Sequence, residues 1–221
     1  MKLLLNACTK YLLGLLMICL LLFWPAGTLE YWNGWLLIAL LFLPMLVLGA
    51  VLFFKAPELL EKRLSTKEKQ QEQKQVVALS GLVFLGGFLL CGLDFRFGWS
   101  QMPVGVVAAA SVIFLISYGL YAEVMRENAY LSRTVEVQEG QKVIDTGLYG
   151  IVRHPMYTAT LGLFLSMPLV LGSFYGFLCF LLYPALILKR IKNEEELLER
   201  ELEGYARYKQ KVKYRLIPFL W

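Results

Sequence analysis

The chain has 221 residues, of which 58% are hydrophobic, and its mean hydropathy of +0.57 is well above that of an ordinary soluble domain. Its formal net charge is +5, but the basic residues are interleaved with acids and follow apolar runs, so nucleic acid is not an expected partner. Neither a P-loop nor a G-x-G-x-x-G motif is present, which leaves soluble nucleotide-binding folds without support.

Apolar runs separated by polar blocks predict a polytopic membrane protein built from helices. A hydrocarbon core of about 30 Å is crossed by about 20 helical residues. The candidate runs are 11–24, 32–54, 76–93, 104–124, 156–171 and 174–188. The last two are short and are separated only by "GSF", which predicts a tight helical hairpin. We therefore expect an all-α integral membrane protein with about six membrane-embedded helices.

The placement of positive charge predicts the orientation of these spans. If the chain crosses six times, only Arg96 of the 22 Lys and Arg residues falls on the second face. The positive-inside rule then assigns the other face to the cytoplasm. We expect both termini, the polar segment 55–75 and the blocks 126–157 and 189–215 to be cytoplasmic. The segment 55–75 is expected to be a surface helix or a mobile loop.

The stretch "GLYGIVRHPMY" contains the only histidine of the chain, at the start of an apolar run. Pro155 suits the first turn of a helix, so His154 is expected beside the N-cap. A helix N-terminus that carries Arg153 and His154 suits an anionic group, and Tyr157 lies on the same side of the first turn. Alternatively, Arg153 snorkels to lipid headgroups and Tyr157 belongs to an aromatic belt.

A second polar block, "LKRIKNEEELLERELEGYARYKQKV", has apolar residues with a period near 3.6. This pattern predicts a helix that continues out of the bilayer and folds back on the protein. Arg190 and Glu194 are one turn apart and share a face, either as a structural ion pair or with Glu194 facing the ammonium of a ligand. Glu195 and Glu196 are expected to point elsewhere, as solvated charges.

Three stretches taken together resemble the isoprenylcysteine carboxyl methyltransferase family: "ENAYLSRTVEVQEGQKVIDTGLYGIVRHPMYTA", "RIKNEEELL" and "GYARYKQKVKYRLIPFLW". The wider group includes phospholipid N-methyltransferases, and its members are integral membrane enzymes that use S-adenosylmethionine. The likeness covers about residues 120–221, whereas residues 1–75 contribute only hydropathy. It implies a two-span region with a cytoplasmic linker over 1–75, followed by a methyltransferase core over 76–221 with a cofactor-binding loop and a C-terminal helix.

The resemblance also implies roles for individual residues. Arg190 corresponds to the arginine at the reacting carboxyl end of the acceptor. The expected cofactor-binding residues are Gln138, Gln141, Lys142, Val143, Ile144, Tyr149, Arg153, His154, Pro155, Met156, Tyr157 and Glu194. Within this set, Glu194 corresponds to the carboxylate that holds the cofactor, and residues 141–144 wrap its adenosine end. The loop before residue 141 is shorter than in the eukaryotic enzymes, so Gln138 aligns only across a gap.

The chemistry of these residues favours transfer of a methyl group to a carboxylate. A carboxylate is already ionised near pH 7 and needs no general base, whereas an amine acceptor must first lose a proton. We expect an amphiphilic, isoprenylcysteine-like or prenylated acceptor that arrives from the lipid bilayer. The alternatives are phospholipid or amine N-methylation, an NADPH-dependent sterol-type reductase that shares a related RHP-x-Y motif, and a membrane protein without enzymatic activity. No metal site is expected, because the four cysteines have no paired spacing.

Overall fold

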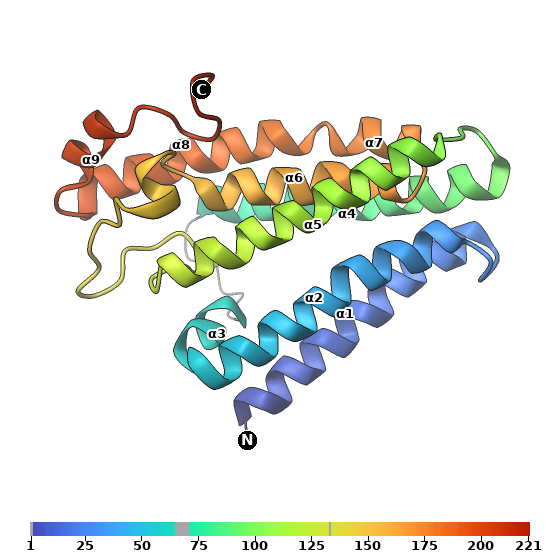
Figure 1. Cartoon of the computed structure of the whole chain (residues 1–221), viewed down its shortest axis with the longest axis horizontal. Helices are drawn as coiled ribbons and strands as arrows, with labels where there is room; N and C mark the ends of the chain where they lie inside the picture. The colour runs from blue at the N-terminus through green and yellow to red at the C-terminus, as the bar shows by residue number, and fades with distance from the viewer. Residues whose placement is uncertain (1, 65–70, 133) are drawn as a thin grey trace.

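The computed structural model describes residues 2–64, 71–132 and 134–221, and over these residues it contains helices but no strands (Figure 1). The helices are α1 (Lys2–Ala26), α2 (Trp32–Lys55), α3 (Pro57–Leu64), α4 (Gln71–Phe97), α5 (Val104–Glu127), the short 3₁₀ helix η1 (Gly147–Gly150), α6 (Pro155–Val170), α7 (Phe174–Phe180), α8 (Tyr183–Glu201) and α9 (Tyr205–Lys211). The all-α prediction is confirmed.

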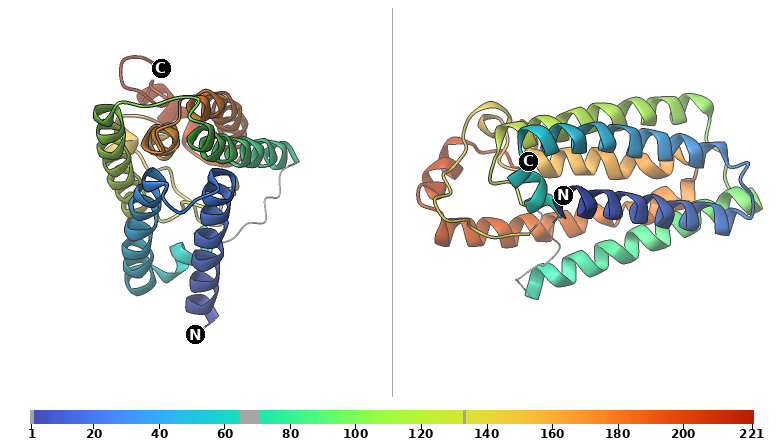
Figure 2. Two further views of the ribbon diagram at one scale, coloured as in Figure 1. Left: turned by 90° about the vertical axis from the view of Figure 1, so that its right-hand side faces the viewer. Right: turned by 90° about the horizontal axis from the view of Figure 1, so that it is seen from below.

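The long helices lie side by side along the longest axis of the molecule and alternate in direction (Figures 1 and 2). Five stretches are long and apolar enough to cross a membrane, namely α1, α2, α4, α5 and the stretch that combines α7 with α8. The sixth apolar helix, α6, has 16 residues, which corresponds to about 24 Å at 1.5 Å per residue. The protein is therefore a polytopic integral membrane protein, as the hydropathy pattern predicts.

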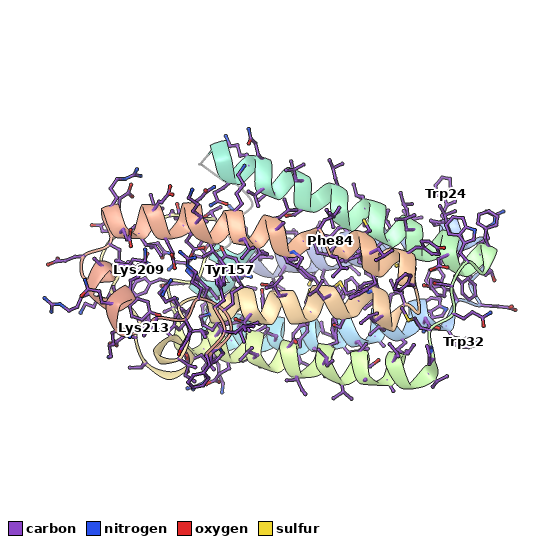
Figure 3. All side chains as sticks on the ribbon, turned by 90° about the horizontal axis from the view of Figure 1, so that it is seen from above. Trp24, Trp32, Phe84, Tyr157, Lys209 and Lys213 are labelled. Atoms are coloured by element: carbon purple, nitrogen blue, oxygen red, sulfur yellow. The ribbon has the colours of Figure 1, made fainter. Side chains whose placement is uncertain are left out.

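The two ends of the bundle differ in character. Figure 3 shows Trp24 and Trp32 at one end and Lys209 and Lys213 at the other, with Tyr157 toward the lysine end. Both chain termini, α3 and α9 also lie toward the lysine end (Figure 1). Tryptophan at one end of apolar helices is typical of a membrane interface. The polar segments that carry the candidate chemistry are thus gathered at a single end.

The predicted hairpin between the last two apolar runs is present. Its turn follows α6 and contains Gly172, whose φ of 76° lies in the left-handed region. Ser173 then caps α7, because its side-chain oxygen accepts a hydrogen bond from the N–H of Gly176. The last pass is broken between α7 and α8, where Pro184 lies in the first turn of α8. As predicted, α8 continues well beyond the apolar run that ends at residue 188.

A buried carboxylate fastens this hairpin to the end of α4. Asp94, which is 1% exposed, accepts hydrogen bonds from the backbone N–H of Ser100 at 2.7 Å and from its hydroxyl at 2.6 Å. The hydroxyl of Ser173 also donates to Asp94. Nearby, Tyr31 donates to the carbonyl of Leu171 at 2.7 Å. These bonds fix the turn between α6 and α7 against α4 and α1–α2.

The main hydrophobic core runs across the proposed boundary at residue 75. It joins Leu22 of α1 and Phe42 of α2 to Phe88 of α4, Phe114 of α5 and Phe180 of α7. The division into regions 1–75 and 76–221 stays a prediction. The polar segment 55–75 forms α3 and the start of α4, and its residues 65–70 lie outside the described part of the chain.

Candidate active site

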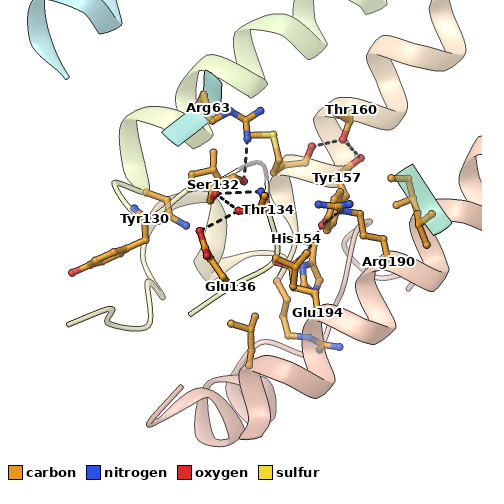
Figure 4. Close-up of a pocket in the computed structure, with 18 of the residues that line it drawn as sticks. Arg63, Tyr130, Ser132, Thr134, Glu136, His154, Tyr157, Thr160, Arg190 and Glu194 are labelled. Atoms are coloured by element: carbon orange, nitrogen blue, oxygen red, sulfur yellow. Dashed lines mark hydrogen bonds between the residues drawn. The ribbon is translucent and has the colours of Figure 1, made fainter. Parts of the chain in front are cut away.

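A cavity of about 580 Å³ opens at the lysine end of the bundle (Figure 4). One part is polar and lies among the loop that follows α5, the start of α6 and the middle of α8. The other part is apolar and is lined by residues of α4, α6 and α8, among them Val76, Gly81, Phe84, Phe164 and Ile187. The volume and the mixed lining are typical of a site for small molecules.

Tyr157 joins the two residues predicted to act together on α8. Its hydroxyl donates a hydrogen bond to Oε2 of Glu194 and accepts one from Nε of Arg190 at 2.9 Å. All three side chains line the cavity (Figure 4). Arg190 and Glu194 share a helix face because they are four residues apart. The phenol in the first turn of α6 therefore connects a cation and a carboxylate at the cavity wall.

The expectation that Glu195 is a solvated charge is wrong. Glu195 is 3% exposed, and its Oε1 accepts a hydrogen bond from Nε of Arg153 at 2.7 Å and lies 3.1 Å from Nε2 of His154. Its Oε2 lies 3.1 Å from a terminal guanidinium nitrogen of Arg215. Glu196, in contrast, is exposed as expected. The buried carboxylate is compensated by several donors, as burial of a charge requires.

Arg153 and His154 fasten the start of α6 to the segment that follows α9. Besides its bond to Glu195, Arg153 donates to the carbonyls of Val212 and Lys213, each at 2.8 Å. The backbone N–H groups of Arg153 and His154 donate to the carbonyls of Tyr214 and Arg215, each at 2.9 Å. Arg153 is 7% exposed, so it does not snorkel toward headgroups. The carboxylate that these two side chains meet belongs to this chain.

Pro155 occupies the first turn of α6, as predicted. His154 is the N-cap residue itself, one position from where it was expected. Met156 and Tyr157 line the cavity, whereas Pro155 is buried and does not.

The loop between α5 and η1 forms one wall of the cavity. Residues 141–144 all line the cavity. The prediction that this stretch wraps around a ligand requires this position. Gln138 does not line the cavity. Its side-chain amide donates to the carbonyl of Tyr130 at 2.6 Å, and its backbone N–H donates to Oε1 of Gln141 at 2.9 Å. In this structure Gln138 therefore holds the loop in shape.

Tyr149 lies in η1, which is anchored by a carboxylate at the end of α5. The backbone N–H of Leu148 donates to Glu127 at 2.9 Å. The Tyr149 hydroxyl accepts a hydrogen bond from the side chain of Asn128 at 2.9 Å, and the Tyr149 carbonyl accepts one from the hydroxyl of Tyr208 at 2.8 Å. Burial raises the pKa of the Tyr149 phenol to about 12. Tyr149 thus faces the cavity in its protonated form.

Sequence reasoning missed a group of polar residues at the cavity rim. Arg63 of α3 donates to the carbonyl of Ser132 at 3.2 Å and also to the hydroxyl of Tyr121. The hydroxyls of Ser132 and Thr134 are 2.9 Å apart, and Thr134 donates to Glu136 at 3.1 Å (Figure 4). Arg63 and Ser132 are 69 residues apart in the chain, so no local pattern predicts that they meet. The polarity of residues 132–136 was the only sequence signal for this group.

The cavity suits two molecules side by side. One carries a positive and a negative group at the same end, and the other has a hydrocarbon part. Glu194 and Glu136 present carboxylates to the cavity, while Arg63 and Arg190 present guanidinium groups. Among the residues that the structure describes, no group of three or more His, Cys, Asp or Glu side chains could hold a metal ion.

Comparison with known proteins finds similarity in the C-terminal half of the chain. Residues 103–203 match the family described as Phospholipid methyltransferase. The chain is also similar to Delta(14)-sterol reductase of Mus musculus, with 29% identity over 91 residues, which is 40% of the chain. That alignment covers 22% of the reductase, so the chain spans only about a fifth of the length of this relative.

Proposed function

We propose that this protein methylates an amphiphilic acceptor, and the match of residues 103–203 to the phospholipid methyltransferase family supports this proposal. The methyl donor is S-adenosylmethionine, and the acceptor atom is a carboxylate oxygen, as in an isoprenylcysteine-like molecule. The observation that carries this proposal is the pair of bonds that join Tyr157 to both Arg190 and Glu194 at the cavity wall.

The residues around the polar part of the cavity fit the proposed cofactor. The carboxylate of Glu194 is a partner for its ammonium group, since charge-assisted hydrogen bonds are stronger than neutral ones. Residues 141–144 and Tyr149 provide a wall for its nucleoside part, and Met156 and Tyr157 line the cavity between the two. When bound, S-adenosylmethionine supplies an electrophilic methyl group on a sulfonium sulfur.

The apolar part of the cavity fits the tail of an acceptor that enters from the bilayer. Gly81 and Val77 of α4 both line it and are both exposed on the outer surface of the bundle. A Cβ atom added at Gly81 would meet no atom within 4 Å. A hydrocarbon chain can therefore lie along α4 with its head group toward Arg190. Each methylene that it buries contributes about 0.8 kcal/mol.

Arg190 gives the site its preference for a carboxylate. Its planar guanidinium holds a carboxylate through two parallel hydrogen bonds, and a carboxylate needs no proton removed before it reacts. The protein then acts chiefly by orienting two reactants and excluding water, and positioning of this kind lowers a barrier substantially. The alternative acceptor is the amine of a phospholipid, which the name of the matched family favours.

A reductase that uses NADPH is the second candidate function, because of the similarity to the mouse Delta(14)-sterol reductase. Calorimetry with the purified protein in detergent separates the two. We expect S-adenosylmethionine and its demethylated product to bind, and NADPH not to bind. Binding of NADPH with no response to S-adenosylmethionine would overturn the methyltransferase proposal.

The acceptor atom is tested with a methyl-labelled donor. The protein is incubated with a carboxylic acid that carries an S-farnesyl thioether or, separately, with phosphatidylethanolamine vesicles. A carboxylate product is a methyl ester, so its label is released by mild base, whereas an N-methyl label is stable. We expect base-labile label on the thiol acid. Stable label on the phospholipid alone would assign the protein to N-methylation.

A further inference from the structure

Tyr205 is a buried hydroxyl at the cavity wall that no role so far explains. It is the first residue of α9, is 4% exposed, and lines the cavity. Its hydroxyl has no hydrogen-bond partner among the residues that the structure describes. A buried polar group without a partner costs about 1–3 kcal/mol, and such groups in native proteins call for an explanation.

Tyr205 packs beside the loop that precedes η1, and the charges nearest its phenol include Glu195 and Glu194 of α8. Its ring packs in a small cluster with Leu202, Tyr208 and Val212, against Val137 and Val143 of the loop. Val143 belongs to the stretch proposed to cover the nucleoside part of the cofactor. Gly204, just before Tyr205, also lies close to this stretch, since a Cβ added there would be 3.9 Å from a methyl carbon of Val143.

The chemistry of Tyr205 is that of a hydrogen-bond donor at neutral pH. Burial raises the pKa of its phenol, so the hydroxyl keeps its proton. Tyr208, one turn further along α9, has the same side chain in similar surroundings, but its hydroxyl donates to the carbonyl of Tyr149 at 2.8 Å. The two tyrosines therefore differ in one respect: the Tyr208 hydroxyl has a partner within the chain, whereas the Tyr205 hydroxyl has none among the described residues.

We infer that the Tyr205 hydroxyl is a binding residue of the cofactor site and hydrogen-bonds the nucleoside part of S-adenosylmethionine. The inference rests on the proposed function and adds a contact from α9, next to the loop 141–144. The nucleoside then lies in the cavity beside the contact between the loop and the start of α9, with the amino acid part toward Glu194. In this arrangement α9 contributes directly to cofactor affinity.

The experiment compares Tyr205→Phe with the matched control Tyr208→Phe in the full-length protein in detergent. Each is titrated calorimetrically with S-adenosylmethionine, adenosine and methionine, and each is melted without ligand. For Tyr205→Phe we expect the Kd for S-adenosylmethionine and for adenosine to rise about three- to tenfold. Methionine binding should not change, and the ligand-free Tm should equal or exceed that of the wild type. Tyr208→Phe should lower the ligand-free Tm, because it removes a bond that the protein makes alone.

Two results would overturn the inference while leaving the proposed function intact. One is adenosine binding by Tyr205→Phe that is as tight as in the wild type. The other is a ligand-free Tm that falls as far as in Tyr208→Phe, which would mark Tyr205 as a purely structural residue. A wild-type protein that binds neither S-adenosylmethionine nor adenosine would overturn the proposed function and this inference together.

Discussion

Arg153 and Glu195 form a buried ion pair in which Nε and Oε1 are 2.7 Å apart and the two side chains are 5% and 4% exposed. The pair connects the start of α6 to α8 across 42 residues of chain. Because Arg153 also binds two carbonyls after α9, the pair lies where three separate segments meet at the cavity wall.

Glu195→Gln is expected to lower stability strongly, because it leaves the guanidinium of Arg153 buried without its counter-charge. Breaking a buried pair in this way costs about 3–5 kcal/mol. The matched control is Glu196→Gln, whose side chain is 63% exposed and 3.9 Å from Lys192; it should change stability by no more than about 0.5 kcal/mol. Thermal melting in detergent compares the two. Equal Tm values for both variants would show that the pair is not structurally important.

Glu194→Gln and Arg190→Lys should fail in different ways. The glutamine variant loses a charge-assisted hydrogen bond worth about 1.5–3 kcal/mol, so the Kd for S-adenosylmethionine should rise about ten- to a hundredfold. The lysine variant keeps its charge but loses the planar fork, so cofactor affinity should persist while the acceptor KM rises or kcat falls. Calorimetry and steady-state kinetics measure both. An unchanged Kd for Glu194→Gln would remove Glu194 from the cofactor site.

Gly81→Leu should shorten the acceptor tail that the protein accepts. The added side chain enters the apolar part of the cavity without meeting an atom of the protein at its Cβ. If it displaces about two methylenes of the tail, the KM for a long-tailed acceptor should rise roughly tenfold. The KM for acceptors with the same head group and a shorter tail should not change. The Kd for the cofactor and the Tm should not change either.

The control for this substitution is Gly119→Leu on α5. A Cβ at Gly119 also meets nothing within 4 Å, and Gly119 does not line the cavity. The KM values for both tail lengths should be unaffected there. Equal effects of the two substitutions on long and short acceptors would place the tail elsewhere.

The two ends of the bundle should be accessible from opposite faces of the membrane. Glu30, between α1 and α2, and Glu139, in the loop before η1, are both exposed. In a background with exposed Cys8 replaced by Ser, Glu139→Cys should react with an impermeant thiol reagent only from the cytoplasmic face, since a six-crossing chain has all but one of its Lys and Arg residues on that face. Glu30→Cys should react only from the opposite face. The reversed pattern would invert the proposed orientation.

Hydropathy and local spacing predicted the parts of this fold that depend on neighbours in sequence. The apolar runs became helices, and Arg190 and Glu194 share a face because a helix turn is 3.6 residues. The resemblance to the isoprenylcysteine carboxyl methyltransferase family, and not local spacing, grouped a further set of residues that line one cavity: 141–144, Tyr149, Arg153, His154, Met156 and Tyr157. Their proposed roles in binding a cofactor remain predictions.

Features that depend on distant contacts were out of reach. In the run Glu194 to Glu196, adjacent side chains point about 100° apart on a helix, and the sequence does not reveal which direction is covered. Glu195 is buried by partners 42 residues before it and 20 residues after it. Arg63 was missed for the same reason, since its partner carbonyl is 69 residues away.

The contact between Arg153 and the carbonyls of Val212 and Lys213 has a consequence for biosynthesis. Arg153 is made about 60 residues before the Lys213 carbonyl that it binds, which takes roughly 3–12 s at about 5–20 residues per second. During that interval α6 can already lie in the bilayer, while the guanidinium of Arg153 remains at the hydrated membrane surface. The contacts that fix Arg153 against Val212 and Lys213 form only after the segment that follows α9 has left the ribosome. The start of α6 is therefore fixed in place late, well after the helices of the nascent chain have inserted.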